Sequence, residues 1–594
     1  MIPDHAPFSP EQRQSLSALL AGVTPQQSLW LSGYLAGVTA SGVVPAAGSA
    51  SVGTPANLTV LFGTESGNCE ELADRTVKAA KKKGIKASLR NLAEISPADL
   101  SKLENVGLIV STWGDGEPPE AIEGFHKAFL TESPDLKGTR FSVCALGDTS
   151  YEKFCEIGKQ YDARLLELGA ERIVDRVDCD VDYEDSYGGW ADQLFAALAE
   201  TQMAVVAAPP LEIAPAEVFD KKNPFPSEVL DNVLLNGEGS SKETIHVELN
   251  LEGSGLDYEA GDALAVVPEN AADVVEAVIR NGQFSPTEMV THKAFEGELS
   301  LKEAFSEKLD ITALSRAIVK KYQALDPVAT SALGDLLAED QKAEFSAWIW
   351  GRQIVDLLAE FPISGLKAQD FVNILRKLPP RLYSIASSPK AHPGEVHLTV
   401  AAVRYDTHER SRKGVASTYL ADDTPKGAKV KVYVHKNKNF RLPEDDNAPV
   451  IMVGPGTGVA PFRAFVEERG EREAKGESWL FFGDQKYSFD FLYQLEWQDH
   501  LKSGALSRLD VAFSRDQPEK VYVQDVMRSR AAELYQWLEK GAYFYVCGDA
   551  QYMAKDVHDA LIEIIATEGG KSAEEAAAYV DELKKTKRYQ RDVY

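Results

Sequence analysis

Two glycine-containing turns, each preceded by an apolar run, most constrain the fold of this chain. Residues 64–68 follow the run 58–62, and residues 454–458 follow 449–453. Each pattern predicts a strand, a tight turn and the start of a helix, which together aim backbone N–H groups at an anion. We therefore expect two separate α/β domains, each with a phosphate-binding turn.

Length and composition predict a multidomain protein. A chain of 594 residues is too long for one core, so three or four domains are expected. The net charge of −28 argues against nucleic acid or an anionic membrane as a partner. No apolar run approaches the ~20 residues that a spanning helix needs. The 5 cysteines show no Cys-x-x-Cys motif and do not cluster with histidine, so we expect no metal site and a cytoplasmic location.

The first part of the chain divides into a leader, an α/β domain and a hinge. Residues 9–37 predict a helical hairpin, followed by a charge-free linker that ends at residue 56, and residues 204–215 predict an Ala/Pro-rich hinge. Between them, residues 57–203 alternate strands with amphipathic helices, which predicts a doubly wound parallel sheet. Its expected strands are 58–62, 87–91, 107–111, 141–146 and 172–174.

The rest of the chain predicts two further domains. Residues 216–445 predict an antiparallel barrel with strands at 244–251, 395–404 and 429–434, and with a helical insertion at about 270–376. Residues 446–594 return to alternating strands and helices, which predicts a second doubly wound domain. Its expected strands are 451–453, 478–482, 508–513 and 543–547, with a closing helix at 572–585.

Three loops of the first domain follow predicted strands and should gather at the carboxyl edge of the sheet, where open α/β sheets bind ligands. Two of them carry an aromatic, Trp113 or Tyr151; either alone is more often ordinary packing. Together the loops resemble the flavodoxin family, which implies FMN between these two rings. The residues that this resemblance assigns to FMN are Thr64, Glu65, Ser66, Gly67, Asn68, Cys69, Ser111, Thr112, Trp113, Gly114, Leu146, Gly147, Asp148, Thr149, Ser150, Tyr151, Glu152, Lys153, Phe154 and Cys155.

Two short motifs follow one another in the middle domain, Arg381-Leu382-Tyr383-Ser384 and Gly414-Val415-Ala416-Ser417. A single match of this kind usually marks an exposed strand edge. As an ordered pair they resemble the FAD-binding barrel of the ferredoxin–NADP⁺ reductase family, which implies that Arg381 neutralises a pyrophosphate and Tyr383 lies on the flavin. The residues assigned to FAD are Thr312, Arg381, Leu382, Tyr383, Ser384, Thr399, Val400, Ala401, Tyr405, Gly414, Val415, Ala416, Ser417 and Tyr594.

The last domain carries Ser514-Arg515 after a predicted strand, with Lys520 and Tyr522 close by. Elsewhere these residues would form a solvated charge run. After the 454–458 turn they are interpreted as the selector of NADP over NAD, because they suit a monoester phosphate on an adenosine ribose. The residues assigned to NADP are Gly456, Thr457, Ser514, Arg515, Lys520, Val521, Tyr522, Val523, Gln524 and Asp556.

Taken in order, these motifs cover residues 57–594 and resemble the diflavin reductase family. The resemblance implies a multidomain α/β oxidoreductase that passes electrons from NADPH through FAD and FMN to a haem protein, with Ser384, Cys547 and Asp592 around the site of hydride transfer. Residues 10–12 and 31–34 resemble more narrowly the flavoprotein subunit of assimilatory sulfite reductase. That resemblance implies a sirohaem, iron–sulfur hemoprotein partner that accepts the electrons in cysteine biosynthesis. An NADPH–cytochrome reductase-type enzyme and a flavin-binding sensor without turnover are the alternatives.

Two further features bear on partners. Residues 9–37 are amphipathic and too short to bury their own apolar face, so we expect a homo-oligomer through this segment, with hemoprotein docking or loose membrane contact as alternatives. Residues 57–203 carry 16 Lys and Arg against 27 Asp and Glu, a net charge of −11. A basic partner face is expected to dock there, although a merely solvated acidic surface explains the charge nearly as well.

Overall fold

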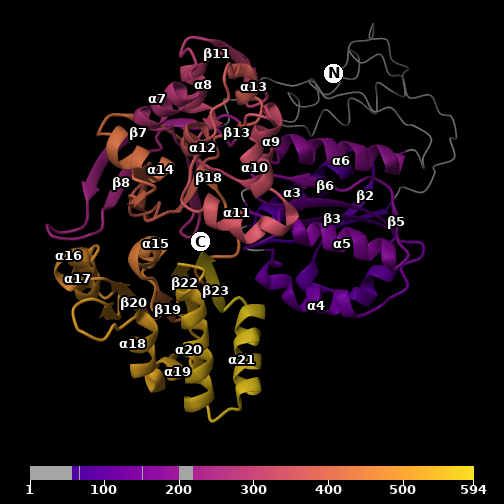
Figure 1. The fold of residues 1–594 in the computed structure, drawn as a ribbon. Coiled ribbons are helices and arrows are strands. Elements are labelled where there is room, and N and C mark those ends of the chain that lie inside the picture. Colours follow the sequence, from indigo (N-terminus) through magenta and orange to yellow (C-terminus); the bar gives the residue numbers. More distant parts are fainter. Residues whose placement is uncertain (1–56, 66, 115, 150, 200–218) are drawn as a thin grey trace, which may run out of the picture. The chain divides into compact units, whose positions relative to one another are not determined.

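The computed structural model describes residues 57–65, 67–114, 116–149, 151–199 and 219–594 (Figure 1). The predicted helical hairpin, its linker and the Ala/Pro-rich hinge lie outside these residues, as do the predicted site residues Ser66 and Ser150. Within the described ranges, no helix has both the length and the apolar character needed to cross a membrane.

The first domain is a parallel sheet with strand order β2-β1-β3-β4-β5, and β6 lies beside β4. Both faces of the sheet are buried, because Leu58 and Val60 of β1 pack with helices α3 and α6 whereas Leu61 packs with α4 and α5. Figure 1 shows these helix pairs over opposite faces. The elements are β1 Asn57–Gly63, α3 Asn68–Lys82, β2 Lys86–Asn91, β3 Asn105–Ser111, α4 Glu123–Thr131, β4 Arg140–Leu146, α5 Glu156–Glu167, β5 Glu171–Arg172, β6 Val177–Cys179 and α6 Glu184–Ala199.

The doubly wound sheet is confirmed, with one difference at its edge. The strand expected at 172–174 is replaced by two short strands, β5 and β6, which both pair with β4. The second of them lies at the start of the acidic run that begins with Asp178, where charged residues hide the strand pattern.

The second domain is an antiparallel sheet with strand order β14-β9-β18-β7-β8-β15. A bridge between Ile385 and Leu398 brings its two edge strands together and closes the predicted barrel. Three strands of this sheet were not predicted: β9 is buried without alternation, β7 contains Pro226, and β14 is only four residues long. The elements are β7 Phe225–Leu234, β8 Thr244–Asn250, β9 Ala263–Val267, β14 Arg381–Ser384, β15 Glu395–Ala401, β16 Arg404–Thr407, β17 Arg410–Lys413, α14 Val415–Thr418 and β18 Lys429–His435.

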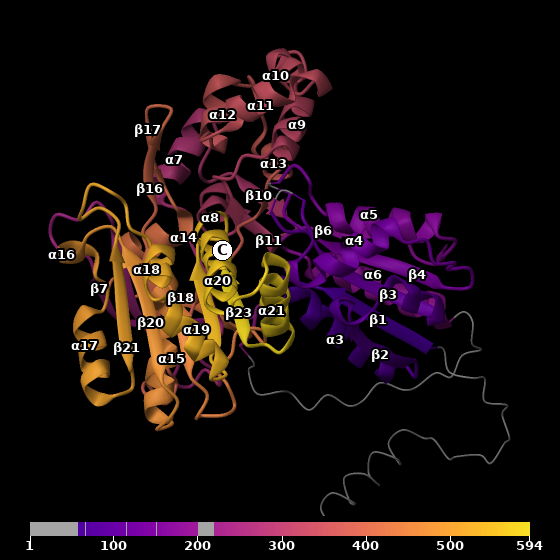
Figure 2. The ribbon, with the colours of Figure 1, turned by 90° about the horizontal axis from the view of Figure 1, so that it is seen from below.

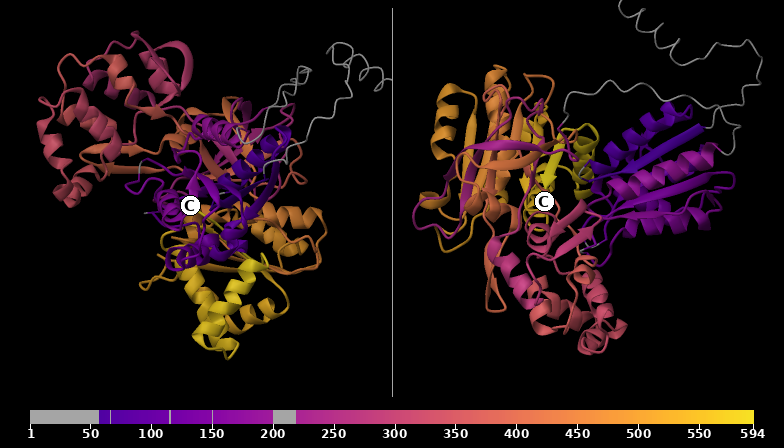
Figure 3. Two further views of the ribbon diagram at one scale, coloured as in Figure 1. Left: turned by 90° about the vertical axis from the view of Figure 1, so that its right-hand side faces the viewer. Right: turned by 90° about the horizontal axis from the view of Figure 1, so that it is seen from above.

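The helical insertion lies between β9 and β14, as expected. Its helices share one hydrophobic core, to which Phe305, Tyr322 and Phe371 contribute. Figure 2 labels these helices, and Figure 3 shows the same red segment gathered into one group. The elements are α7 Ala272–Asn281, β10 Met289–His292, β11 Phe295–Ser300, α8 Leu301–Glu307, β12 Leu309–Asp310, α9 Arg316–Leu325, α10 Ser331–Leu336, α11 Lys342–Ile349, α12 Ile354–Glu360, α13 Ala368–Val372 and β13 Arg376–Lys377.

The third domain is a parallel sheet with strand order β21-β20-β19-β22-β23. Helices α18 to α21 pack against one face and α15 and α17 against the other, so that this sheet is also doubly wound (Figure 1). The edge strand β23 was not expected. The elements are β19 Val450–Val453, α15 Ala460–Glu471, β20 Ser478–Asp484, α16 Tyr487–Asp490, α17 Gln494–Ser503, β21 Arg508–Phe513, α18 Val523–Ser529, α19 Ala531–Glu539, β22 Tyr543–Gly548, α20 Met553–Glu568, α21 Ala573–Lys585 and β23 Tyr589–Val593.

Candidate functional site

Residues of both predicted flavin sites line one large cavity. Its volume is about 1800 Å³, and its lining includes Trp113 and Tyr151 of the first domain, Arg381 and Leu382 of β14, and the C-terminal Tyr594. Pockets for single small ligands usually measure about 300–1,000 Å³. The cavity is therefore large enough for more than one flat ring system.

The first turn has the geometry of a phosphate site. Thr64 Oγ1 accepts the backbone N–H groups of Gly67 at 2.9 Å and of Cys69 at 3.3 Å, which folds the turn tightly onto the start of α3. Gly67 has φ 86° in the left-handed region that glycine adopts without steric cost. Gly67 and Asn68, at the start of α3, line the cavity, so that a ligand anion there would lie at a helix N-terminus.

The second and third loops hold their aromatics by backbone contacts. Trp113 and Glu117 exchange two backbone hydrogen bonds of 2.8 Å, which closes the second loop. In the third loop, Thr149 is anchored because its N–H and hydroxyl donate to Asp180 at 3.0 and 2.6 Å. Tyr151 remains 52% exposed at the cavity. The buried Ser111 Oγ has no hydrogen-bonding partner among the described residues, which suits a polar ligand atom in the cavity.

Most residues assigned to the FMN site meet at this cavity. The lining residues are Glu65, Gly67, Asn68, Ser111, Thr112, Trp113, Gly114, Leu146, Gly147, Asp148, Tyr151, Lys153, Phe154 and Cys155. Thr64, Cys69, Thr149 and Glu152 are described but are not part of the lining. Asp148 also accepts a hydrogen bond of 2.9 Å from Arg376, a barrel-domain residue that the sequence did not indicate.

The residues assigned to FAD divide into two groups. Arg381, Leu382 and Tyr594 line the cavity, whereas Thr312, Tyr383, Ser384, 399–401, Tyr405 and 414–417 do not. Thr399 instead hydrogen-bonds Tyr493 at 2.6 Å, and Val400 belongs to the barrel core. The 414–417 segment forms the start of α14, where Ser417 Oγ accepts the N–H of Val403 at 3.1 Å. The structure thus brings Arg381 and Leu382 of the β14 motif to the cavity, but not Tyr383, Ser384 or the α14 motif.

Ser384, Cys547 and Asp592 come together from three strands of two domains. Ser384 Oγ at the end of β14 donates to Asp592 Oδ2 at 2.6 Å, and Cys547 Sγ lies 3.8 Å from the same oxygen. Cys547 and Asp592 are register partners on the parallel strands β22 and β23. Burial raises the pKa of the Asp592 carboxyl, against the lowering effect of the two hydrogen bonds. The cluster therefore contains a partly buried acid that titrates above the range of an exposed aspartate.

The second glycine turn lies directly beside this cluster. A Cβ at Gly458 would stand 2.1 Å from the carbonyl oxygen of Cys547, so only glycine permits this approach. Thr457 Oγ1 lies 2.9 Å from the Tyr594 hydroxyl, which joins the turn to the C-terminal ring. A ligand phosphate held by this turn would consequently place the rest of that ligand next to Ser384, Cys547 and Asp592.

The predicted phosphate selector follows β21. The backbone N–H groups of Ser514 and Arg515 donate to the carbonyl oxygens of Asp484 and Gln485 at 2.9 and 2.8 Å, which fixes the loop. The side chains of Arg515, Lys520 and Tyr522 are exposed there. Gln524 and Asp556 are linked by a hydrogen bond of 3.2 Å, and Val523 is buried in the core. Two exposed cations on a fixed loop suit a dianionic phosphate.

No sequence pattern indicated Lys242, a cation that lies beside the 454–458 turn. Its Nζ donates to both carboxylate oxygens of Asp484 at 2.7 and 2.9 Å, and it lies 3.6 Å from the position of a Cβ at Gly456. The carboxylate could have been noticed because it lies two residues beyond the predicted strand 478–482. The lysine had no local signal, because it lies on a loop of the barrel domain.

Comparisons with known proteins match the three domains. Family models for flavodoxin, an FAD binding domain and an oxidoreductase NAD-binding domain match residues 60–190, 217–419 and 452–559. The chain is 46% identical to the "sulfite reductase [NADPH] flavoprotein alpha-component" of Bacillus subtilis, with 99% of each chain covered. It is 43% identical to the proteins of the same name from Vibrio parahaemolyticus and Photobacterium profundum, with 93% of this chain and 89% or 90% of theirs covered.

The chain belongs to the sulfite reductase flavoprotein alpha-component family. The predicted multidomain α/β fold is confirmed: a flavodoxin domain comes first, followed by an FAD-binding domain with its helical insertion and by an NAD-binding oxidoreductase domain. The predicted resemblance to diflavin reductases is confirmed by the same matches.

Proposed function

We propose that this chain is an NADPH-dependent diflavin oxidoreductase, the flavoprotein subunit of an assimilatory sulfite reductase. Electrons from NADPH would pass through FAD and FMN to a sirohaem, iron–sulfur hemoprotein that reduces sulfite to sulfide. The observation that carries this proposal is the junction of Ser384, Cys547 and Asp592 beside both the 454–458 turn and Tyr594. The names of the family relatives support the choice of acceptor.

The residues at the first turn fit FMN. The start of α3 and the Thr64 turn would hold a terminal phosphate, and Trp113 and Tyr151 would flank the flat ring. The orphaned Ser111 hydroxyl would gain a partner from the ligand. Both aromatics line one cavity, which supports this assignment.

The residues around β14 fit the flavin ring of FAD. Arg381 and Tyr594 line the same cavity as the FMN candidates, so two flavin rings would lie near one another. Bound flavins take up electrons in pairs from nicotinamide and release them one at a time, which a haem acceptor requires. Tyr594 of this chain would cover the flavin face that nicotinamide has to reach.

Three side chains would lie at the site of hydride transfer. Asp592, as a carboxylate, would stabilise the positive charge that develops on nicotinamide, and Ser384 would hold that carboxylate by its 2.6 Å hydrogen bond. Cys547 is fully buried, and burial raises the pKa of its thiol, so it would pack against the ring as a thiol rather than act as a nucleophile.

The nucleotide site would select NADPH through the loop after β21. Arg515, Lys520 and Ser514 would hold the ribose phosphate that distinguishes NADPH from NADH. Lys242 would instead serve the phosphates held by the glycine turn, because its ammonium group lies beside Gly456. Arg515 and Lys520 on the one hand, and Lys242 on the other, therefore have separable roles.

The proposed assembly is an oligomer that functions in the cytoplasm. Residues 9–37 would associate several copies, and the acidic first domain would dock a basic face of the hemoprotein. Deletion of residues 1–56 should give a monomer that retains both flavins, as measured by light scattering and absorption. If the full-length chain is already monomeric, the oligomer proposal is wrong.

Turnover with defined acceptors tests the proposed function. The purified chain should contain FMN and FAD in equal amounts and should oxidise NADPH rapidly only when an electron acceptor is present. Adding a sirohaem hemoprotein with sulfite should yield sulfide, whereas cytochrome c should report electron exit alone. Reduction of cytochrome c without any sulfide formation would instead favour a cytochrome reductase-type enzyme.

A further inference from the structure

A cluster of histidine and glutamate side chains lies on the barrel, away from the residues that carry the proposed electron path. His246 and Glu248 lie two residues apart on β8, and Glu395 and His397 lie two residues apart on β15. Each pair therefore points to one face of its strand. The antiparallel register places His397 directly opposite Glu248, which makes the His-x-Glu of one strand the neighbour of the Glu-x-His of the other.

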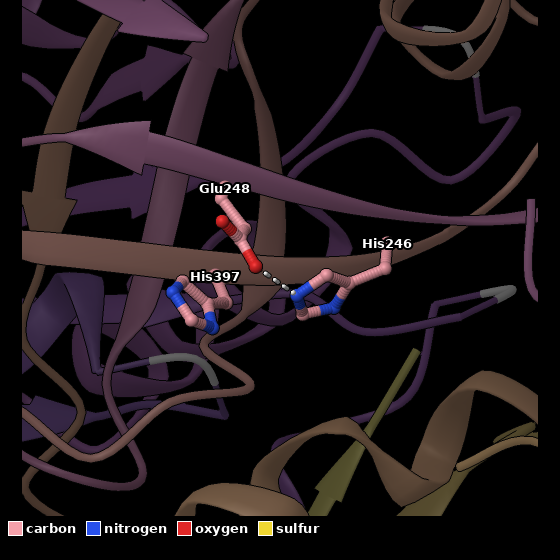
Figure 4. Close-up of side chains that lie close together, drawn as sticks. All are labelled: His246, Glu248 and His397. Atoms are coloured by element: carbon pink, nitrogen blue, oxygen red, sulfur yellow. Dashed lines mark ion pairs between the residues drawn. The ribbon is translucent and has the colours of Figure 1, made fainter. Parts of the chain in front are cut away.

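The donor atoms of His246, Glu248 and His397 converge. One donor from each lies within 4.8 Å of the other two, and His246 Nε2 stands 3.4 Å from Glu248 Oε1 (Figure 4). Zinc bonds of about 2.0–2.1 Å put tetrahedral ligands about 3.4 Å apart. The spacing of the first pair therefore already equals one edge of such a site.

We propose that His246, Glu248 and His397 bind a divalent transition cation of the zinc type, with Glu395 or water as the fourth ligand. Glu395 Oε2 already lies 3.2 Å from His397 Nε2. Two imidazoles with carboxylates suit zinc and its neighbours, whereas magnesium prefers oxygen ligands alone. Glu248 and Glu395 are partly exposed, which gives the cation a path from solvent.

The electrostatics of the cluster are compatible with a cation. Burial lowers the pKa of His246 to about 3 and that of His397 to about 2, so both rings are neutral and keep a lone pair at neutral pH. Burial and repulsion from the nearby Glu395 carboxylate raise the pKa of Glu248. A cation between these groups would remove that repulsion.

Hydrogen bonds behind the ligands orient them. The hydroxyl of Tyr493 lies 2.9 Å from His246 Nδ1 and 2.6 Å from Thr399 Oγ1, so the Nδ1 proton has an acceptor while Nε2 faces Glu248. Such partners on the outer nitrogen are typical of metal-binding histidines. They also explain why Thr399 points to this cluster rather than to the cavity.

The Arg463 guanidinium disfavours metal binding, because it contacts His397, one of the proposed ligands. Its Nη1 lies 3.3 Å from His397 Nδ1, so metal binding through Nε2 would move the ring proton to Nδ1 and sacrifice this contact. The same Nη1 keeps its 2.7 Å hydrogen bond to the carbonyl of Ala386. The arginine charge is already paired with Glu467 at 3.1 Å and Glu496 at 2.6 Å. The cost is therefore the loss of this contact and the approach of two N–H donors, which the hydrogen bond to Ala386 and the two ion pairs of Arg463 offset in part.

No local sequence pattern indicated this site. Sequence analysis expected no metal because it considered the cysteines, and the matching His-x-Glu and Glu-x-His patterns lie about 150 residues apart, with only the strand pairing to join them. The proposal concerns the barrel itself and does not depend on the acceptor of electrons.

Metal content of the flavin-loaded, full-length chain tests the proposal. Protein prepared without a histidine tag is stripped with a chelator, equilibrated with ZnCl₂ or MgCl₂, desalted and analysed by mass spectrometry. We expect one zinc and no magnesium per chain. Glu248→Gln and His246→Gln should lower zinc affinity at least about tenfold, while Glu252→Gln beyond the end of β8 and His408→Gln should not.

A second measurement guards against misfolding. Flavin content must be unchanged in each variant, and zinc should raise the unfolding temperature of the wild-type chain but not of Glu248→Gln. Zinc that washes out of the wild-type chain, or that is retained equally by Glu248→Gln, overturns the proposal. In that case the cluster is a hydrogen-bonded polar network only.

Discussion

The two flavin-related regions are built in opposite ways. The first region uses contiguous loops at one sheet edge, and its contacts are local: Thr64 binds Gly67, and Trp113 binds Glu117. The hydride region joins residues far apart in sequence, since Ser384 and Asp592 are 208 residues apart. Local loops tolerate single changes, whereas a shared buried carboxylate couples two domains. Substitutions should therefore act separately in the first region and together in the second.

The largest effect is expected at Asp592. Asp592→Asn removes the charge that would stabilise nicotinamide but preserves the shape, so flavin reduction by NADPH should slow about a hundredfold with both flavins bound. Stopped-flow absorption at the flavin band measures this rate. Asp559→Asn, an exposed change on α20, serves as the control. A wild-type rate in Asp592→Asn would show that the Ser384–Asp592 bond has only a structural role.

The selector should separate the two nicotinamide cofactors. Arg515→Ala should raise the KM for NADPH roughly 10- to 100-fold and leave NADH nearly unchanged, because a charge-assisted bond to the extra phosphate is lost. Steady-state kinetics with both cofactors test this, and Arg528→Ala on α18 is the matched control. If KM rose equally for NADPH and NADH, Arg515 would not belong to the phosphate selector.

The pH dependence sharpens the role of Asp592. Burial raises the pKa of this carboxyl, so flavin reduction should decline as pH falls through a range above that of ordinary aspartates. Asp592→Asn should lack this acid limb. Because folding raises the pKa, the stability that Asp592 contributes is greatest when protonated and is lost as pH rises through the folded pKa. Asp592→Asn should therefore lose less thermal stability at alkaline pH than the wild-type chain does, as measured by thermal melts. An acid limb of flavin reduction that is unchanged in this variant would show that another group titrates there.

The first region should give the smallest and most confined effect. Tyr151→Ala removes one face of the proposed ring sandwich and should weaken FMN binding about tenfold, by analogy with stacking of flat bases on aromatic side chains. Tyr151→Phe keeps the ring and should bind FMN as the wild-type chain does. FAD content and the rate of flavin reduction by NADPH should not change. Loss of FAD together with FMN would contradict the separation of the two regions.

Sequence reasoning worked best where function lies in contiguous residues. The glycine turns and the aromatic loops were found because each motif follows its own strand, and the structure places most of the loop residues at one cavity. It failed where strand pairing decides the contacts. Lys242 beside Gly456, and the partners His397 and Glu248, become neighbours only after distant segments fold together. Thr399 was assigned to a flavin, but its hydroxyl faces Tyr493.

The central claim is that electrons enter through the hydride region and leave through the first region. Selective removal of FMN from the full-length chain tests it most directly, with stopped-flow reduction of FAD by NADPH and reduction of a haem acceptor followed in parallel. The account predicts that FAD reduction keeps its rate, that haem reduction is lost, and that added FMN restores it. Full haem reduction by the FMN-free chain would contradict the account.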